Sequence, residues 1–452
     1  MLAALRGERT DFTKGAIGLA IFYLAVPMVA ELVIEGLFAV VDIYCLSYVS
    51  QDAVSVVGIT ESVMFIVYSL AIGLGMGATA MVARRTGESD QDGASHAAAQ
   101  AVLLGLIVSV FIAVIGVGFA EPMLRLFSDE ENLIQTGVPY VRIMMGTNAV
   151  IVFLFLFNSI FRGTGEARYA MWALALSSVL NIVLDVTLIF GLGPFPELGL
   201  KGAAIATSIG RGVGVLLQLV LLLRSHTTIR WVREHFVPRA RILSRLVQVS
   251  AGGILQFAIE SLSWIFLTYL VVQYGSETRS GYFIAFRIVI FSILPSWGIA
   301  NAAATLVGQN LGARQYIRAE ASVWTAAKYN TVFLIISSIV FFLIAKPLVT
   351  LFMDDPVVIQ QGVRALRIIC FGYIFLGYGM VVGQSFNGAG DTWTPTIWNF
   401  VVFWLIQIPL AWLLSKWIGP EGIYLSIAIS TTLIAIILVW KFRQGHWKSI
   451  QI

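Results

Sequence analysis

Residues 120–129 read AEPMLRLFSD, and residues 345–354 read AKPLVTLFMD. The second run follows the first at an offset in numbering of 345 − 120 = 225. The same offset relates VARRTG at 82–87 to VGQNLG at 307–312, and RGTGE at 162–166 to NGAGD at 387–391. One constant offset across three distant segments indicates a duplicated chain. We therefore predict two similar lobes that pack as a pair.

The composition places this duplicated chain in a membrane. Of its 452 residues, 58% are hydrophobic and 12% are charged, and the mean hydropathy is +0.86. Soluble domains carry about 25% charged residues. Apolar stretches of about 20 residues, the length of a membrane-spanning helix, recur along the chain. We predict an all-α membrane protein with twelve transmembrane helices in two pseudo-symmetric six-helix lobes. The expected spans are 17–46, 54–81, 96–119, 136–161, 168–192, 199–223, 246–273, 280–306, 321–345, 359–386, 394–417 and 421–440.

Basic residues lie in alternate loops and set the expected orientation. The second loop has Arg84 and Arg85, and the long linker at 225–244 is rich in arginine, whereas the opposite loops are acidic or poor in charge. By the positive-inside rule, both termini and the linker are cytoplasmic in a multi-pass protein of the inner (plasma) membrane. The expected units are an N-terminal lobe (1–224), a basic linker (225–244) and a C-terminal lobe (245–452). An even number of spans per half relates the lobes by an axis along the membrane normal.

The basic loops also account for the net charge of +4 without any nucleic-acid partner. Contact with anionic lipid headgroups is an alternative use of the linker arginines.

Carboxylates interrupt the apolar spans, mostly in the first half. A carboxylate at mid-bilayer costs about 2.5–3.5 kcal/mol on insertion scales, so a group of them indicates a use. Asp42 aligns with Leu267 and Asp185 with Leu410, so these two have no counterpart in the repeat. A duplicated scaffold with a charged site in one half is typical of transporters. The acids inside predicted spans are Glu31, Glu35, Asp42, Glu61, Asp185 and Glu260.

Helical spacing groups several of these side chains. Glu31, Glu35 and Asp42 fall within about 40° of one another at 100° per residue, so they share one stripe of the first helix. In the fifth helix, Asn181 and Asp185 lie one turn apart on a polar face. Two carboxylates with amide and hydroxyl oxygens suit a small hard cation or a pair that exchanges protons. The alternative is that each acid is a lone polar group satisfied by helix–helix hydrogen bonds.

Several motifs together resemble the multidrug and toxic compound extrusion (MATE) family over essentially the whole chain. They are Val41-Asp42, Asn158 before the RGTG run at 162–165, and the NIVLD run at 181–185. The resemblance implies export of amphipathic, often cationic aromatic compounds in exchange for inward H⁺ or Na⁺. It also implies a cation site in the N-terminal lobe, where the same residues are metal ligands only if Na⁺ is the coupling ion. The implied site residues are Asp42, Asn181, Asp185 and Thr207, with Asn158 nearby.

One branch of the family also uses a seventh-helix Glu and a tenth-helix Asp. Glu260 matches the former, but 359–386 contains no carboxylate, so a complete second cation site is not expected. Glu260 is the counterpart of Glu35, since 35 + 225 = 260, and the two glutamates can face each other across the pseudo-twofold axis. The competing view makes Glu260, or Glu61, the counter-ion of Arg287. The expected substrate-cleft residues are Glu35, Glu260, Gln256, Trp264, Glu31, Glu61 and Arg287.

No chemistry on the substrate is expected. The four histidines (His96, His226, His235 and His446) show no ligand spacing, and no Walker-type loop for ATP is present. Cys45 and Cys370 do not correspond under the repeat and indicate neither a disulfide nor a metal site. We expect a monomer that needs no cofactor beyond the coupling ion.

Two other functions stay open on the sequence. One is a flippase for a lipid-linked precursor or polysaccharide of the same superfamily, which would have extra helices and a large cationic groove. The other is a non-transporting membrane receptor, which has no use for acids on a common stripe.

Overall fold

The computed structural model describes residues 11–48, 51–127, 129–224 and 227–452. Within these ranges all regular elements are helical, and twelve helical stretches are long and apolar enough to cross a membrane. The predicted fold class and the number of spans are confirmed. The first half contains α2 (Ile17–Ser47), α3 (Gln51–Gly87), α4 (Gln91–Gly118), α5 (Ala120–Arg125), α6 (Glu131–Gly146), α7 (Asn148–Thr164), α8 (Ala167–Phe190) and α9 (Leu200–Leu223).

A short 3₁₀ turn, η1, leads into the second half. The remaining elements are η1 (Arg233–Phe236), α10 (Ala240–Val272), α11 (Ser276–Gly312), α12 (Tyr316–Leu343), α13 (Ala345–Thr350), α14 (Pro356–Ala389), α15 (Trp393–Asn399), the π-helical η2 (Phe400–Gln407), α16 (Ile408–Ile418), α17 (Pro420–Arg443) and η3 (His446–Ser449). α10 begins at Ala240, so the C-terminal part of the expected linker is helical.

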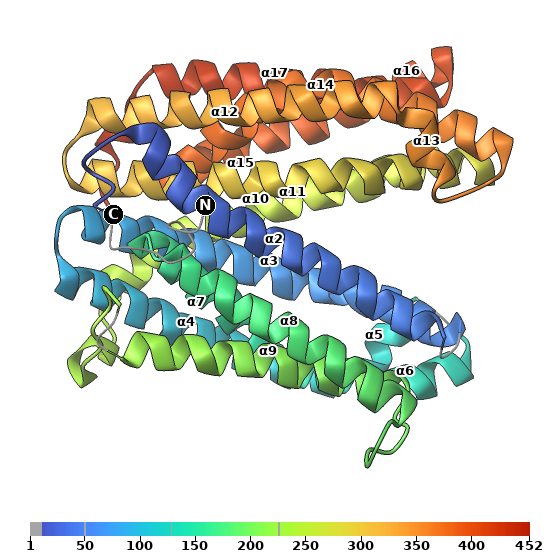
Figure 1. The fold of residues 1–452 in the computed structure, drawn as a ribbon, viewed down its shortest axis with the longest axis horizontal. Coiled ribbons are helices and arrows are strands. Elements are labelled where there is room, and N and C mark those ends of the chain that lie inside the picture. The colour runs from blue at the N-terminus through green and yellow to red at the C-terminus, as the bar shows by residue number, and fades with distance from the viewer. Residues whose placement is uncertain (1–10, 49–50, 128, 225–226) are drawn as a thin grey trace.

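The two halves form two bundles. The blue-to-green helices gather in one and the yellow-to-red helices in the other, and α2 runs between them (Figure 1). α2 packs on α8 of its own bundle and on α11 of the other, and α3 packs on α10 and α11. α2 and α3 therefore supply much of the contact between the lobes.

The sequence repeat reappears in the bounds of the helices. Both ends of α3, α4 and α5 recur in α11, α12 and α13 at the sequence offset, as in 276 − 51 = 225. The repeated segments that begin at Ala120 and Ala345 each start with a six-residue helix, α5 and α13. The offset changes before the last helix of each lobe, because α9 begins at Leu200 and α17 at Pro420 (420 − 200 = 220). The loop from α8 to α9 spans 191–199, whereas Gly419 alone separates α16 from α17.

The glycine-rich runs are helix stops, as their sequence predicts. Gly165 follows α7 with φ of 84°, and Gly390 follows α14 with φ of 87°. This left-handed conformation ends a helix and favours glycine, which has no Cβ to clash. The two positions correspond under the repeat (390 − 165 = 225), so the repeat keeps the turn geometry as well as the helices.

Glycines allow close packing between the lobes at the end of the bundle where α3 passes into α4, and also farther along α3, where a Cβ on Gly73 would lie 2.5 Å from the Ile254 backbone nitrogen. A Cβ added to Gly87 would lie 1.9 Å from the Gln309 carbonyl oxygen, and one added to Gly312 would lie 2.1 Å from that of Arg84. Near the other end of α3, a Cβ on Gly58 would meet nothing within 4 Å. Small residues let helix backbones approach closely in membranes, so these glycines fix where the lobes touch.

Candidate functional site

The polar face of α8 meets α9 inside the first lobe. When the Asn181 amide is oriented so that both of its polar atoms are satisfied, its Nδ2 donates to Asp185 Oδ2 at 2.7 Å. Its Oδ1 then accepts from the backbone N–H of Thr207 at 3.0 Å and from the Thr207 hydroxyl at 3.3 Å. Asp185 is 0% exposed and Asn181 is 1% exposed. A carboxylate, an amide and a hydroxyl thus converge in a site shielded from solvent.

Local sequence explains why α8 and α9 come so close. α9 has Gly210 opposite Asn181, and a Cβ at Gly210 would lie 2.8 Å from the Cβ of Asn181. Three of the four predicted cation-site residues are therefore together. The fourth, Asp42, is on α2, which packs against α8, but its side chain lies outside the described residues. Its place in the site stays a prediction.

Glu31 lies in a buried polar network. Its Oε1 accepts from Asn158 Nδ2 at 2.8 Å and pairs with Arg162, and Gln218 Nε2 donates to Asn158 Oδ1. Glu31 is 3% exposed and is not among the residues that line the two cavities described below. Arg162, at the end of α7, pairs with the Glu31 carboxylate and itself lines the cavity between the lobes, so the place of Glu31 in the cleft stays a prediction.

Glu35 also has a cationic partner. Arg211 of α9 donates to Glu35 Oε1 at 2.9 Å, is 5% exposed and lies over the ring of Phe38. Sequence reasoning missed this arginine. The available signal was its isolation, since it is the sole charged residue in the stretch 202–223. A lone charge in an apolar span generally has a partner on another helix.

The first cavity crosses the interface between the lobes and has a volume of about 420 Å³. Glu35, Glu61 and Arg162 line it from the first lobe, and Trp297 and Asn301 line it from the second. Glu61 therefore faces a cleft, and its use in binding a substrate stays a prediction. The charges in this cavity are mixed, because Arg162 and the nearby Arg211 oppose its acids.

The second cavity lies mainly within the C-terminal lobe and has a volume of about 300 Å³. Gln256, Glu260 and Trp264, three of the expected cleft residues, line it together. Asn399, the last residue of α15, donates through Nδ2 to Glu260 Oε1. No ion pair in the described part of the chain includes Glu260. This cavity therefore presents one partly buried acid among aromatic and amide side chains.

Stacked aromatic rings lie where the two cavities adjoin. Phe65 of α3 stacks on Phe257 of α10 at a centroid distance of 5.7 Å, and Phe257 stacks on Trp297 of α11 at 6.5 Å. Phe257 and Trp297 line both cavities. Glu35 and Glu260 line different but adjoining cavities, and the expectation that the two glutamates face each other across the pseudo-twofold axis stays a prediction.

Arg287 does not have the role expected from the sequence. It is exposed on α11, lines neither cavity and forms no ion pair within the described ranges. The view that Glu260 or Glu61 is its counter-ion is wrong, because Glu260 is bonded to Asn399 and Arg287 projects from an exposed face of its helix.

The MatE family model matches residues 27–187 and again residues 253–413. The two stretches repeat at nearly the offset found in the sequence and together cover more than two thirds of the chain. The chain belongs to the MatE family. The family expected from the sequence motifs is thereby confirmed.

Relatives of this MatE protein match nearly full length. It is 25% identical over 429 residues to the probable multidrug resistance protein NorM of Thermotoga maritima, covering 94% of this chain and 92% of the relative. It is 26% identical over 432 residues to a FAD transporter of Shewanella oneidensis, with 95% of each chain covered. A solved structure, the outward-facing conformation of a multidrug resistance MATE family transporter of the MOP superfamily, superposes with a TM-score of 0.91.

That solved structure is 26% identical, with 98% of this chain and 100% of the other covered. These relatives are transporters, which points to a non-enzymatic role for this MatE protein. Together with the twelve apolar helices, they make it a multi-pass membrane protein of a multidrug efflux family.

Proposed function

We propose that this MatE protein is a cation-coupled antiporter that exports amphipathic, cationic aromatic compounds by alternating access. The observation that carries the proposal is the cavity of the C-terminal lobe. There Glu260 has no ion-pair partner in the described chain, and Trp264, Phe257 and Trp297 supply aromatic walls. A positively charged aromatic ligand would gain both a counter-ion and ring contacts in such a cavity.

The mixed-charge cavity fits this substrate less well. Arg211 pairs with Glu35, and Arg162 is one of the lining residues, so a cationic ligand would meet positive charge there. We therefore assign the cationic group of the substrate to Glu260. The first cavity, which crosses the interface, would serve as the path between the lobes.

The coupling ion would bind in the N-terminal lobe. Asp185, Asn181 and Thr207 provide carboxylate, amide and hydroxyl oxygens, and we place Asp42 with them on the family pattern. These donors suit either a proton shared by two carboxylates or Na⁺. Coupling then follows from the reciprocity of binding. An ion that stabilises one arrangement of the lobes weakens the binding of a drug that binds the other arrangement.

The proposed orientation places both termini and the basic loops in the cytoplasm. Arg84 and Arg85 lie at the end of the bundle where the glycine contacts join the lobes. With that end cytoplasmic, this arrangement is closed toward the cytoplasm. Transport would require these contacts to separate.

The test is dye flux in proteoliposomes that contain the purified full-length protein. A proton gradient and a sodium gradient are imposed separately, and efflux of a cationic dye is recorded. We expect one gradient to drive the flux and the matched ionophore to abolish it. Absence of any gradient-driven flux would refute the antiporter assignment and favour a receptor, whereas flux of a lipid-linked precursor alone would favour the flippase.

A further inference from the structure

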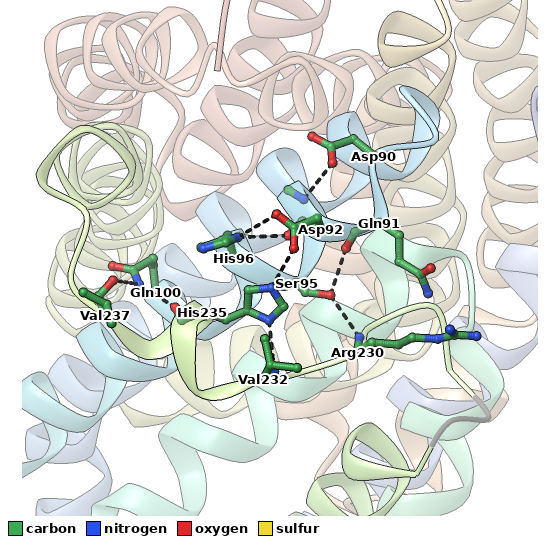
Figure 2. A network of polar contacts seen from close by, with 11 residues as sticks. Asp90, Gln91, Asp92, Ser95, His96, Gln100, Arg230, Val232, His235 and Val237 are labelled. Carbon is green, nitrogen blue, oxygen red and sulfur yellow. Dashed lines mark hydrogen bonds and ion pairs between the residues drawn. The ribbon is translucent and has the colours of Figure 1, made fainter.

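Two histidines that lie far apart in the sequence meet at the end of the bundle that carries the linker. His96 is in the first turns of α4 and His235 is in η1, and both face Asp92 (Figure 2). Asp92 Oδ1 is 2.9 Å from His235 Nε2, and Asp92 Oδ2 is 3.2 Å from His96 Nδ1. One ligand atom from each of the three residues lies within 4.8 Å of the others. The histidines show no metal-ligand spacing in the sequence, as expected, but the fold brings His96 and His235 together around Asp92.

The two histidine side chains of this cluster are buried, whereas the aspartate side chain is exposed. The side chains of His96 and His235 are 5% and 4% exposed, whereas that of Asp92 is 76% exposed. The two imidazoles are therefore held in the protein, and the carboxylate opens the cluster to solvent. His96 Nε2 is buried, and no atom of the described chain forms a hydrogen bond with it.

The linker holds His235 in place through bonds of its own. Gln100 of α4 donates through Nε2 to the carbonyls of His235 (2.8 Å) and Val237 (2.9 Å), and its Oε1 accepts from the Arg239 backbone N–H at 3.0 Å. Figure 2 shows Gln100 reaching the linker beside the two histidines. The backbone that carries His235 is thus fixed to α4 independently of the imidazole. Such preorganisation lowers the entropic cost of binding an ion.

We propose that Asp92, His96 and His235 form a binding site for a divalent transition-metal ion such as Zn²⁺. Two imidazoles and a carboxylate are common ligands of this ion, at about 2.0–2.2 Å, and a fourth position is often a water. The two short distances to the carboxylate show that the donors already converge, and the exposed Asp92 leaves a route for entry. The site is separate from the proposed coupling site, because it joins α4 to the linker.

Metal binding would change the linker. The Val232 backbone N–H donates to His235 Nδ1 at 3.2 Å, so in the metal-free protein the proton of a neutral His235 is on Nε2. An ion on Nε2 moves that proton to Nδ1, and the Val232 amide then loses its acceptor. Occupation of the site should therefore alter the backbone at 232–236, directly before the first helix of the second lobe. The ion would act on the segment that joins the lobes.

The binding test uses full-length, tag-free protein that has been stripped with chelator and is titrated with ZnCl₂ in a calorimeter. We expect one Zn²⁺ per chain, and we expect His96→Ala and His235→Ala each to weaken the affinity at least about tenfold. His446→Ala is the matched control and should bind as the parent does. No saturable Zn²⁺ binding by the parent, or unchanged binding by both histidine variants, would overturn the proposal.

A second measurement needs no variant. Co²⁺ bound by nitrogen and oxygen ligands in a tetrahedral site absorbs visible light, and Zn²⁺ should abolish this absorption by displacement. Hydrogen exchange at 232–236 should change when Zn²⁺ is added to the parent protein. An absent Co²⁺ band, together with exchange that is unaffected by Zn²⁺, would leave Asp92 and the histidines as a purely hydrogen-bonded anchor and contradict the metal site.

Discussion

At the scale of single residues, the acids within the spans of this protein differ in what faces them. Arginines pair with Glu31 and Glu35, an amide with Glu260, and an amide and a hydroxyl accompany Asp185. A carboxylate paired with arginine holds its charge at little cost, whereas carboxylate, amide and hydroxyl oxygens together suit a proton or a hard cation. Asp185 and Glu260 are therefore the acids to which we assign the coupling ion and the drug, respectively.

Asp185→Asn should abolish gradient-driven efflux, because the variant keeps the volume of the side chain and removes the exchangeable charge. Asp42→Asn should do the same, and the double variant should be little worse than either single one, since two members of one site are not additive. Initial rates of dye efflux at equal protein per vesicle provide the check. Losses of ion affinity that add in the double variant would place the two acids in separate sites.

Glu260→Gln should weaken the binding of a cationic dye by about tenfold or more, because it removes the proposed counter-ion from the cavity of the C-terminal lobe. The binding of the coupling ion should stay intact, because the proposed ion site is in the other lobe. A neutral analogue of the dye is the control ligand and should bind both proteins similarly. Loss of ion binding in this variant would contradict an ion site confined to the N-terminal lobe.

Arg162→Met should destabilise the folded protein by about 3–5 kcal/mol, because Glu31 would then be buried without its partner. Adding Glu31→Leu should restore much of that loss, since no uncompensated charge remains. Thermal melting in detergent measures both variants. Equal stability of Arg162→Met and the parent would show that the pair contributes nothing to folding.

At the scale of helices, the glycine contact between the lobes can be tested within α3, which contains both a test position, Gly87, and a control position, Gly58. A Cβ on Gly87 would overlap the Gln309 carbonyl at 1.9 Å, whereas one on Gly58 meets nothing within 4 Å. Gly87→Ala should therefore push the lobes apart at this end, and Gly58→Ala should not. Gly58 lies inside α3 and Gly87 is its last residue, so neither alanine is disfavoured by helix propensity and only the steric contact at Gly87 should be destabilising.

Spin labels at Ser89 and Arg314, which are exposed and equivalent under the repeat, report this distance by double electron–electron resonance in a background without Cys45 and Cys370. The distance distribution should broaden or lengthen in Gly87→Ala and match the parent in Gly58→Ala. An unchanged distribution in Gly87→Ala would mean that the glycine contact does not hold the lobes together.

Much of the helical organisation could be predicted from sequence because it is local or repeated. The paired segments that begin at Ala120 and Ala345 start with α5 and α13, and Gly165 and Gly390 end their helices alike. Asn181 and Asp185 share a face because they are one turn apart. Apolar length, helical spacing and turn chemistry are properties of short stretches, which is why they could be predicted.

The contacts between side chains that are distant in the sequence depend on which helices become neighbours, and they could not be predicted. The pairing of Arg211 with Glu35 joins residues 176 positions apart, and Asp92 meets His235 across 143 positions. No spacing rule connects such residues. The sequence predicts an ion-pair partner for Arg287 because a charge in an apolar span generally has one, and this prediction is wrong because the structure places Arg287 on an exposed face of α11.

For the whole molecule, we propose that an ion bound in one lobe and a drug bound in the other act on the same movement of the lobes. The proposed ion site lies between α8 and α9, and the proposed drug cavity is the cavity lined by Glu260, which the stack of Phe65, Phe257 and Trp297 borders. No direct contact between ligands is needed for coupling, because each can favour a different arrangement of two rigid bundles.

The most direct measurement is the affinity for a cationic dye, determined in detergent with and without the coupling ion, for the parent and for Asp185→Asn. We expect the ion to weaken dye binding by about 5- to 150-fold in the parent, and we expect the dye affinity of Asp185→Asn not to respond to the ion. Dye affinity that is independent of both H⁺ and Na⁺ in the parent, or that still responds to the ion in Asp185→Asn, would contradict the proposed coupling.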